Sequence, residues 1–286
     1  MSEERGVSTR TLVESMLRAD ATIDTAELYD VAHTLGMTDQ QVRLCVKRLV
    51  GEGQLVAEGR GRKAVLRATE AMMAIIEPDL EFIRYMYAQD RGQADWDGTW
   101  HVVAFAVPES ARSARDAMRD AVLRLGGAAI QGGLYVSANP WTEHIRTAAQ
   151  RLGVVDRVST FSTVDLSVNG MTDPLVLAEQ LWPIDRIADG YRRLLAVAER
   201  SLHALPEADR IARLRITIEL AAAFSRAVEP DPLLPPALLQ QPWVGSAARA
   251  VVGKCWSELM AADHSEPLQL FRWYADVVAQ VTEPGE

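Results

Sequence analysis

The sequence contains little cysteine and no long apolar run. Cys45 and Cys255 lie far apart and do not form the closely spaced, even-numbered set of a small disulfide framework. No run of 18 apolar residues is present, and Glu3, Glu4 and Arg5 interrupt any apolar core of a signal peptide. We therefore expect a protein of the reducing cytoplasm that has no membrane among its partners.

The sequence also lacks the common motifs of catalysis and phosphate binding. None of G-x-S-x-G, G-x-x-x-x-G-K-[ST], G-x-G-x-x-G or H-E-x-x-H occurs. The five histidines are scattered and lack the spacing of metal ligands, at His33, His101, His144, His203 and His264. We therefore predict a protein that is not an enzyme, with no catalytic residue, no metal site and no cofactor.

Charge is distributed unevenly near the N-terminus. The formal net charge of −9 argues against a protein that coats nucleic acid over its whole surface. Residues 1–37 hold three Arg against seven Asp or Glu, whereas residues 38–69 hold seven Lys or Arg against three Asp or Glu. This short stretch carries the only concentrated positive charge, and it predicts a local anion-binding surface.

The first 69 residues contain three helical patterns followed by a hairpin pattern. Apolar residues recur with a helical period over 8–19, 24–35 and 38–50. Asp24 and Thr38 are suitable N-caps, and each has Glu or Gln three residues later, as in a capping box. Two strand-like segments, 54–58 and 63–68, flank a glycine-punctuated turn. Three helices and a basic hairpin predict a winged helix-turn-helix.

The third predicted helix presents hydrogen-bond donors on its outer face. Its inner face is apolar at Val42, Cys45, Val46, Leu49 and Val50, and Gln40, Arg43 and Lys47 share the outer face. Arg can bond both major-groove acceptors of guanine, and Gln can pair with adenine. The alternative is a charged face that meets solvent or an acidic partner protein without binding DNA. The predicted DNA-binding residues are Thr38, Gln40, Gln41, Arg43, Lys47 and Arg48 of this helix with Arg60, Arg62 and Lys63 of the hairpin.

The remaining chain divides into a mixed part and a helical part. Between residues 96 and 172 the patterns follow the order strand, helix, hairpin, helix, strand, which is the ferredoxin-like βαββαβ order. Helices are expected further on, near 187–205, 207–228, 244–260 and 267–281. The sequence therefore predicts a multidomain α+β protein with a winged helix-turn-helix domain at 1–69, a connecting helix and linker at 70–95, a ferredoxin-like domain at 96–172 and a helical C-terminal domain at 173–286.

Several short phrases occur in a recognisable order: Trp96-Asp-Gly98 with Trp100, Val102 to Glu109, Gly132 to Ser137, Leu181-Trp182, Tyr191-Arg192 and Asp231 to Pro235. Across residues 8–262 this order resembles the PaaX family of phenylacetate-catabolism repressors. The resemblance implies a winged helix, a central domain similar to that of CRISPR-associated spacer-acquisition nucleases, and a helical C-terminal domain. It also implies a homodimer that binds double-stranded operator DNA and is released by an aryl- or acyl-CoA effector.

A nuclease on such a central domain needs a carboxylate at the end of its first strand to hold a divalent metal. That strand, from His101 to Val107, is followed by Glu109 but contains no carboxylate, and Asp97 precedes it in a predicted turn. We therefore expect the scaffold without the nuclease chemistry.

An acyl-CoA effector needs cations for its phosphates and an apolar pocket for its acyl group. Because helical arginines usually form surface ion pairs and tryptophans usually fill cores, the effector-binding residues stay unknown. The candidate effector-binding residues are Arg192, Arg193, Arg213, Arg215 and Arg226 with Trp182, Tyr191, Phe224 and Trp243.

An acyl-CoA enzyme is the least supported alternative function, since no nucleophile or base is arranged for catalysis.

Overall fold

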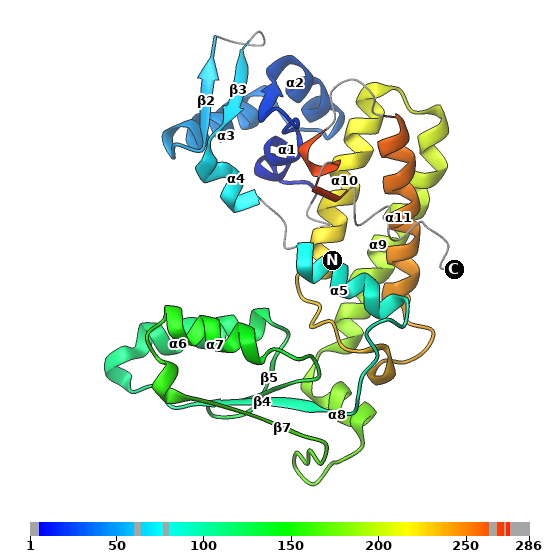
Figure 1. Cartoon of the computed structure of the whole chain (residues 1–286). Helices are drawn as coiled ribbons and strands as arrows, with labels where there is room; N and C mark the ends of the chain where they lie inside the picture. The colour runs from blue at the N-terminus through cyan, green and yellow to red at the C-terminus, as the bar shows by residue number, and fades with distance from the viewer. Residues whose placement is uncertain (1–5, 60–63, 77–79, 263–267, 272, 275–286) are drawn as a thin grey trace. The chain divides into compact units, whose positions relative to one another are not determined.

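The computed structural model describes residues 6–59, 64–76, 80–262, 268–271 and 273–274, which form a mixed α/β architecture with two antiparallel sheets (Figure 1). Segments Met1–Arg84, Gly190–Val228 and Gly245–Glu286 form one compact unit. Segments Tyr85–Asp189 and Glu229–Val244 form a second compact unit. Each unit combines segments that are distant in the sequence. This grouping does not test which segments fold independently, so the linear domain boundaries stay a prediction.

The N-terminal part of the first unit contains three helices and a three-stranded sheet. The strand order is β1-β3-β2, with both neighbouring pairs antiparallel. The sequence pattern does not predict β1, because a strand of three residues is too short to display a period. The elements are α1 (Thr9–Ser15), β1 (Thr22–Asp24), α2 (Thr25–Thr34), α3 (Asp39–Gly51), β2 (Leu55–Glu58) and β3 (Val65–Ala68).

Local sequence explains where α2 and α3 begin. Asp24 accepts a hydrogen bond from the Glu27 amide at 2.9 Å, and Thr38 forms the predicted capping box with Gln41. The capping box expected at α2 is wrong in its second bond, from the Asp24 amide to the Glu27 carboxylate. That carboxylate binds Arg18 and Arg210 instead. Val50, expected on the inner face of α3, is 38% exposed. Val50 lies eight residues after Val42, which is more than two full helical turns, so its side chain is rotated away from the core.

The three N-terminal helices share a core that positions α3. Leu12 of α1, Leu28 of α2, and Val42 and Leu49 of α3 are fully buried. Each buried Leu or Val side chain contributes roughly 1.5–3 kcal/mol, so this core holds α3 firmly. α1 and α2 also pack against α10 (Arg210–Val228), a helix of the same unit (Figure 1). The C-terminal half of the chain therefore supports the N-terminal helices.

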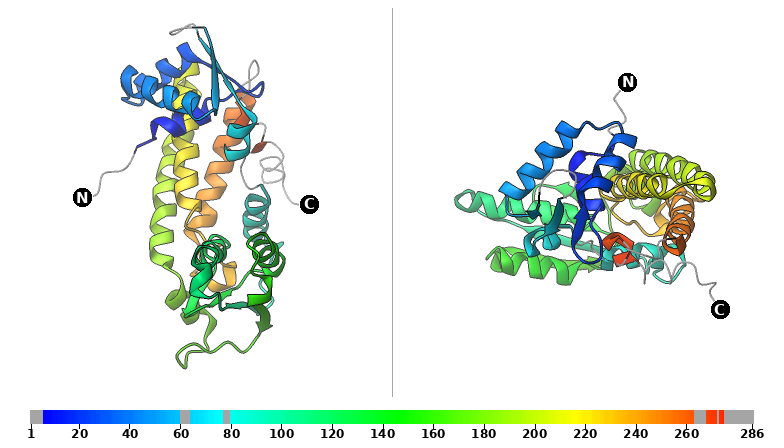
Figure 2. Two further views of the ribbon diagram at one scale, coloured as in Figure 1. Left: turned by 90° about the vertical axis from the view of Figure 1, so that its left-hand side faces the viewer. Right: turned by 90° about the horizontal axis from the view of Figure 1, so that it is seen from above.

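Long helices complete the first unit. From Gly190 onward, α9 (Ile184–Ala204) runs beside α10 and α11 (Val244–Ala262) (Figure 2). The buried Arg249 of α11 donates a hydrogen bond to the Tyr191 hydroxyl of α9 at 2.8 Å. Of the helix predicted at 267–281, all but residues 268–271 and 273–274 lies outside the described residues. Among the helices described, none has the length and apolar composition to cross a membrane.

The second unit has the βαββαβ order that the sequence predicts. Its strands form one antiparallel sheet in the order β5-β6-β4-β7. The helices α6 and α7 cover one face of this sheet, where Val103, Phe105 and Tyr135 pack with Met118 and Ile145 (Figure 1). The elements are β4 (Trp100–Phe105), α6 (Arg112–Arg124), β5 (Ala128–Gln131), β6 (Leu134–Ser137), α7 (Thr142–Arg151) and β7 (Val158–Thr163).

Three further helices flank the central sheet in the sequence: α4 (Glu70–Ile76), α5 (Leu80–Asp90) and α8 (Pro174–Leu181). Just after α8, Trp182 stacks on Trp100 of β4 with ring centres 6.3 Å apart. Its indole N–H donates to the Gly126 carbonyl at 2.9 Å. These buried aromatic residues therefore belong to the packing of the second unit.

Candidate nucleic-acid interface

The exposed face of α3 is the surface that the N-terminal packing leaves free. Val42, Cys45 and Leu49 are buried on one side of the helix, whereas Gln40, Arg43 and Lys47 are exposed on the other. These three polar residues lie three and four positions apart, so they share a face about two turns long. The structure therefore brings together the central residues of the DNA-binding surface predicted from the sequence.

Two other predicted residues, Thr38 and Gln41, serve the helix terminus. The Thr38 amide and hydroxyl donate to the Gln41 side-chain oxygen at 2.8 and 3.0 Å, and the Gln41 amide donates back to the Thr38 hydroxyl at 3.3 Å. This box satisfies backbone donors that the first turn of a helix leaves without partners. A role in capping therefore accounts for both side chains without a ligand.

The cations of α3 differ in their partners. Arg48 lies 3.8 Å from the Glu52 carboxylate, one turn further along. Within the described part of the chain, neither Arg43 nor Lys47 forms an ion pair. Arg43 and Lys47 consequently keep their full positive charge available to an anionic partner, whereas part of the Arg48 charge is neutralised.

The hairpin supplies the second part of the predicted surface. β2 and β3 pair in antiparallel register, and Gly59, just after β2, has a positive φ of 93°, which glycine adopts without strain. Arg60, Arg62 and Lys63 lie outside the described residues. In the described part of the hairpin, Arg67 pairs across the strands with Glu58 at 3.2 Å. The prediction for the three turn cations therefore stays a prediction.

Two features near α3 are absent from the sequence-based prediction. His33 at the end of α2 is hydrogen-bonded to Asp39 in the first turn of α3, with 2.6 Å between the ring nitrogen and the carboxylate oxygen. Leu44 of α3 is 56% exposed, whereas Val42, Cys45 and Leu49 of the same helix are buried. Helical spacing from Gln40 places Leu44 on the outer face, but leucine is usually a core residue, so residue type alone does not predict its exposure.

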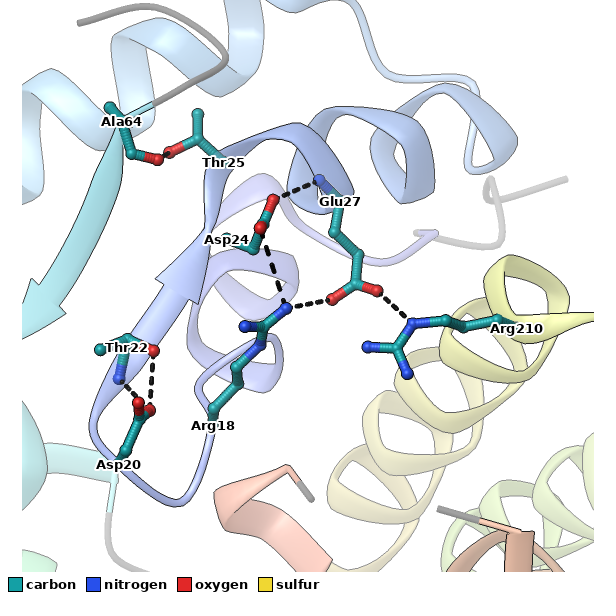
Figure 3. Close-up of polar contacts among 8 residues, drawn as sticks. All are labelled: Arg18, Asp20, Thr22, Asp24, Thr25, Glu27, Ala64 and Arg210. Carbon is teal, nitrogen blue, oxygen red and sulfur yellow. Dashed lines mark hydrogen bonds and ion pairs between the residues drawn. The ribbon is translucent and has the colours of Figure 1, made fainter. Parts of the chain in front are cut away.

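A partly buried carboxylate connects α2 with α10. Glu27 of α2 accepts hydrogen bonds from Arg18 at 3.1 Å and from Arg210 of α10 at 2.7 Å (Figure 3). The Glu27 side chain is 12% exposed, and that of Arg18 is 17% exposed. Because charged hydrogen bonds shielded from water are stronger than those at an open surface, the Arg18 interaction is the stronger of the two, and the half-exposed Arg210 adds a weaker link between α2 and α10. No local sequence pattern pairs residues so far apart, so sequence reasoning missed it.

Two family models match the chain. The model described as PaaX protein central Cas2-like domain matches residues 93–174. The model described as PaaX-like protein C-terminal domain matches residues 182–266, and the two matches together cover more than half of the chain. The chain belongs to the PaaX family. Neither match includes α1 to α5, so the interpretation of α3 in this PaaX-family protein depends on its own residues.

A solved structure resembles this PaaX-family chain over most of its length. The uncharacterized protein Rv0674 from Mycobacterium tuberculosis matches 89% of this chain and 98% of its own, with 23% sequence identity and a TM-score of 0.53. At this identity the likeness shows the fold alone. A search of curated proteins finds no match.

The two carboxylates considered for nuclease chemistry have structural partners in this PaaX-family protein. Asp97 accepts a hydrogen bond from the Thr99 amide at 2.8 Å, which lowers the pKa of its carboxyl and fixes the predicted turn before β4. Glu109 pairs with Arg115 at 2.7 Å. Within the described ranges, no group of three His, Cys, Asp or Glu side chains is placed to hold a metal ion.

The candidate effector residues are distributed over both units. Of the aromatic candidates, Tyr191 and Phe224 are buried in the first unit, and Trp182 and Trp243 are buried in the second. Arg192, Arg193 and Arg226 are exposed, and Arg213 and Arg215 are half-buried. Arg215 pairs with Glu219 at 3.7 Å, and Arg213 donates to the Ala208 carbonyl at 2.9 Å. These interactions assign no effector-binding residue.

Proposed function

We propose that this PaaX-family protein is a sequence-specific DNA-binding transcriptional regulator in which α1 to β3 form a winged helix-turn-helix. In this proposal α3 is the recognition helix, and the β2–β3 hairpin is the wing. The element order, the antiparallel hairpin and the packing of α3 across α1 and α2 support the assignment. The protein acts by binding, with no catalytic step.

The observation that carries the proposal is the outer face of α3. Gln40, Arg43 and Lys47 are exposed, and the two cations have no ion-pair partner among the described residues. An Arg bonded to guanine or a Gln bonded to adenine provides about 1–3 kcal/mol of discrimination against a wrong base. Lys can bind the major-groove acceptors of guanine as Arg does, and any phosphate contact from this face adds affinity that is insensitive to sequence. The same face thus offers both kinds of contact that a DNA reader needs.

The proposal includes a homodimer on an inverted or near-inverted repeat. One helix of this length provides few base contacts, and two symmetric copies double them while requiring correct half-site spacing. Family membership supports this arrangement. Sedimentation of the full-length protein with its DNA should give two chains per site, and one chain per site would refute the dimer.

The proposed signal is an aryl- or acyl-CoA thioester that favours the non-DNA-binding state. The packing of α1 and α2 on α10 provides a physical connection through which a change in the helical part can reach α3. A tenfold preference of the effector for the free protein corresponds to about 1.4 kcal/mol of coupling, and DNA must then weaken effector binding equally. Calorimetric titration of CoA thioesters with and without DNA tests this, with CoA and free acids as controls; equal affinity in both cases would refute it.

The DNA-binding assignment is tested by removing Arg43 and Lys47 together. Full-length protein is first used to select duplexes from a random pool, and the affinity of Arg43→Ala/Lys47→Ala is then measured against salt. Binding to the selected duplex should weaken by at least tenfold, and the salt slope should decrease by about one for each phosphate that is no longer neutralised. The matched control is Arg112→Ala/Arg119→Ala, which removes two exposed charges from α6. Equal affinities and slopes for the two double variants would contradict the assignment.

A further inference from the structure

Leu44 is an exposed apolar side chain in the middle of the outer face of α3. It is 56% exposed, whereas Val42, Cys45 and Leu49 of the same helix are buried. Single exposed apolar residues are common on protein surfaces and need no explanation by themselves. The position of Leu44 is the informative feature, because polar and cationic side chains surround it.

Helical geometry places Leu44 between the residues that the proposed function assigns to DNA. Gln40 lies one turn before it, and Lys47 lies one turn after it, at positions i, i+4 and i+7 along one line. Arg43 is adjacent and exposed. A helix that puts Gln40 and Lys47 against base edges must therefore put Leu44 against the base pair between them.

The major groove offers one prominent apolar group, the 5-methyl group of thymine. The cations around Leu44 favour a polyanion as the occupant of this face over an acidic protein surface with an apolar pocket, because Arg43 and Lys47 flank Leu44 without carboxylate partners in the described chain. We propose that Leu44 determines specificity by contacting the methyl group of a thymine between the bases that Gln40 and Lys47 face. The inference rests on the proposed DNA-binding function and adds an identified base to it.

The test removes the methyl group without changing base pairing. Each thymine of the selected duplex is replaced singly by deoxyuridine, and the affinity of the full-length protein is measured for each duplex. One thymine in each half-site should be sensitive, and its replacement should weaken wild-type binding about fourfold, since a buried methyl or methylene group contributes ~0.8 kcal/mol. Leu44→Ala should bind the thymine and deoxyuridine duplexes equally, and Leu44→Met should keep part of the difference.

The matched control is Ile75→Ala on α4, because Ile75 is 57% exposed and lies outside α3. This variant should keep the wild-type response to deoxyuridine. Thermal unfolding of Leu44→Ala should resemble that of the wild type, since Ala is a good helix former and the side chain removed is mostly exposed.

The outcomes separate this inference from the function on which it rests. If no duplex is enriched in the selection, DNA binding itself is refuted. If a duplex is enriched but every deoxyuridine has the same effect on wild type and Leu44→Ala, DNA binding stands and the role of Leu44 is refuted. A selection that enriches no duplex would leave a protein partner as the occupant of the face around Leu44 to test.

Discussion

Glu27→Ala should destabilise the N-terminal part of the first unit by about 2–3 kcal/mol. The Glu27 carboxylate is 12% exposed and accepts from Arg18, which is itself 17% exposed, at 3.1 Å. Removing one partner of such a pair leaves a charge that is largely shielded from water and lacks its hydrogen bond. The residual interaction of Arg18 with Asp24, at 3.9 Å, limits the cost.

The ion pair with α10 should contribute less. Arg210 is 50% exposed, so its 2.7 Å interaction with Glu27 is screened by solvent and is expected to contribute about 0.2–1 kcal/mol. Arg210→Ala should therefore cost clearly less than Glu27→Ala. In the double variant the two costs should fall short of additivity, because the Arg210 ion pair is already absent once Glu27 is removed.

Two measurements follow from this ranking. Urea denaturation gives the free energy of unfolding, and hydrogen exchange in α2 and the first turns of α10 shows whether the destabilisation is local. Glu199→Ala is the matched control, since Glu199 is an exposed residue of α9 without an ion pair in the described chain. Equal costs for Glu27→Ala and Arg210→Ala, or unchanged exchange in α2, would refute the burial argument.

Two predictions concern the thiols and the central glycines. Burial raises the pKa of Cys255 from its ordinary value of 9.0 to about 11, so this thiol should not react with Ellman's reagent at pH 8 until the chain unfolds. The unfolded thiol loses its proton first, so its contribution to stability should be lost as pH rises from about 9 to about 11; native-state labelling at pH 8 would contradict both points. Gly126→Ala should cost more than about 2 kcal/mol in thermal unfolding, because φ is +79° and a Cβ would lie 2.4 Å from the Pro232 carbonyl oxygen. Gly132→Ala should be nearly neutral, because no atom lies within 4 Å of a Cβ at this position. Equal costs for the two variants would refute the steric argument, since the backbone at Gly126 would then shift to accept the added methyl group.

Local patterns in the sequence predicted the helices and strands of the central unit and most of the N-terminal part. The capping box at Thr38 and Gln41 and the βαββαβ order of the second unit depend on neighbours in the chain, and both are confirmed. The sequence did not predict β1, because this strand is defined by its pairing with β3 and not by a pattern in its own three residues.

The sequence by itself determined the family, the order of the elements and the polar face of α3, because each depends on residue identity and on periods of two or 3.6 residues. Only the tertiary structure decided which side chains of that face are available. It buried one side of α3 against α1 and α2 and left Leu44 exposed beside Arg43 and Lys47. It also brought Arg210 to Glu27 across most of the chain. Such arrangements are set by long-range packing of apolar faces, which fixes the distance between residues that no local period relates.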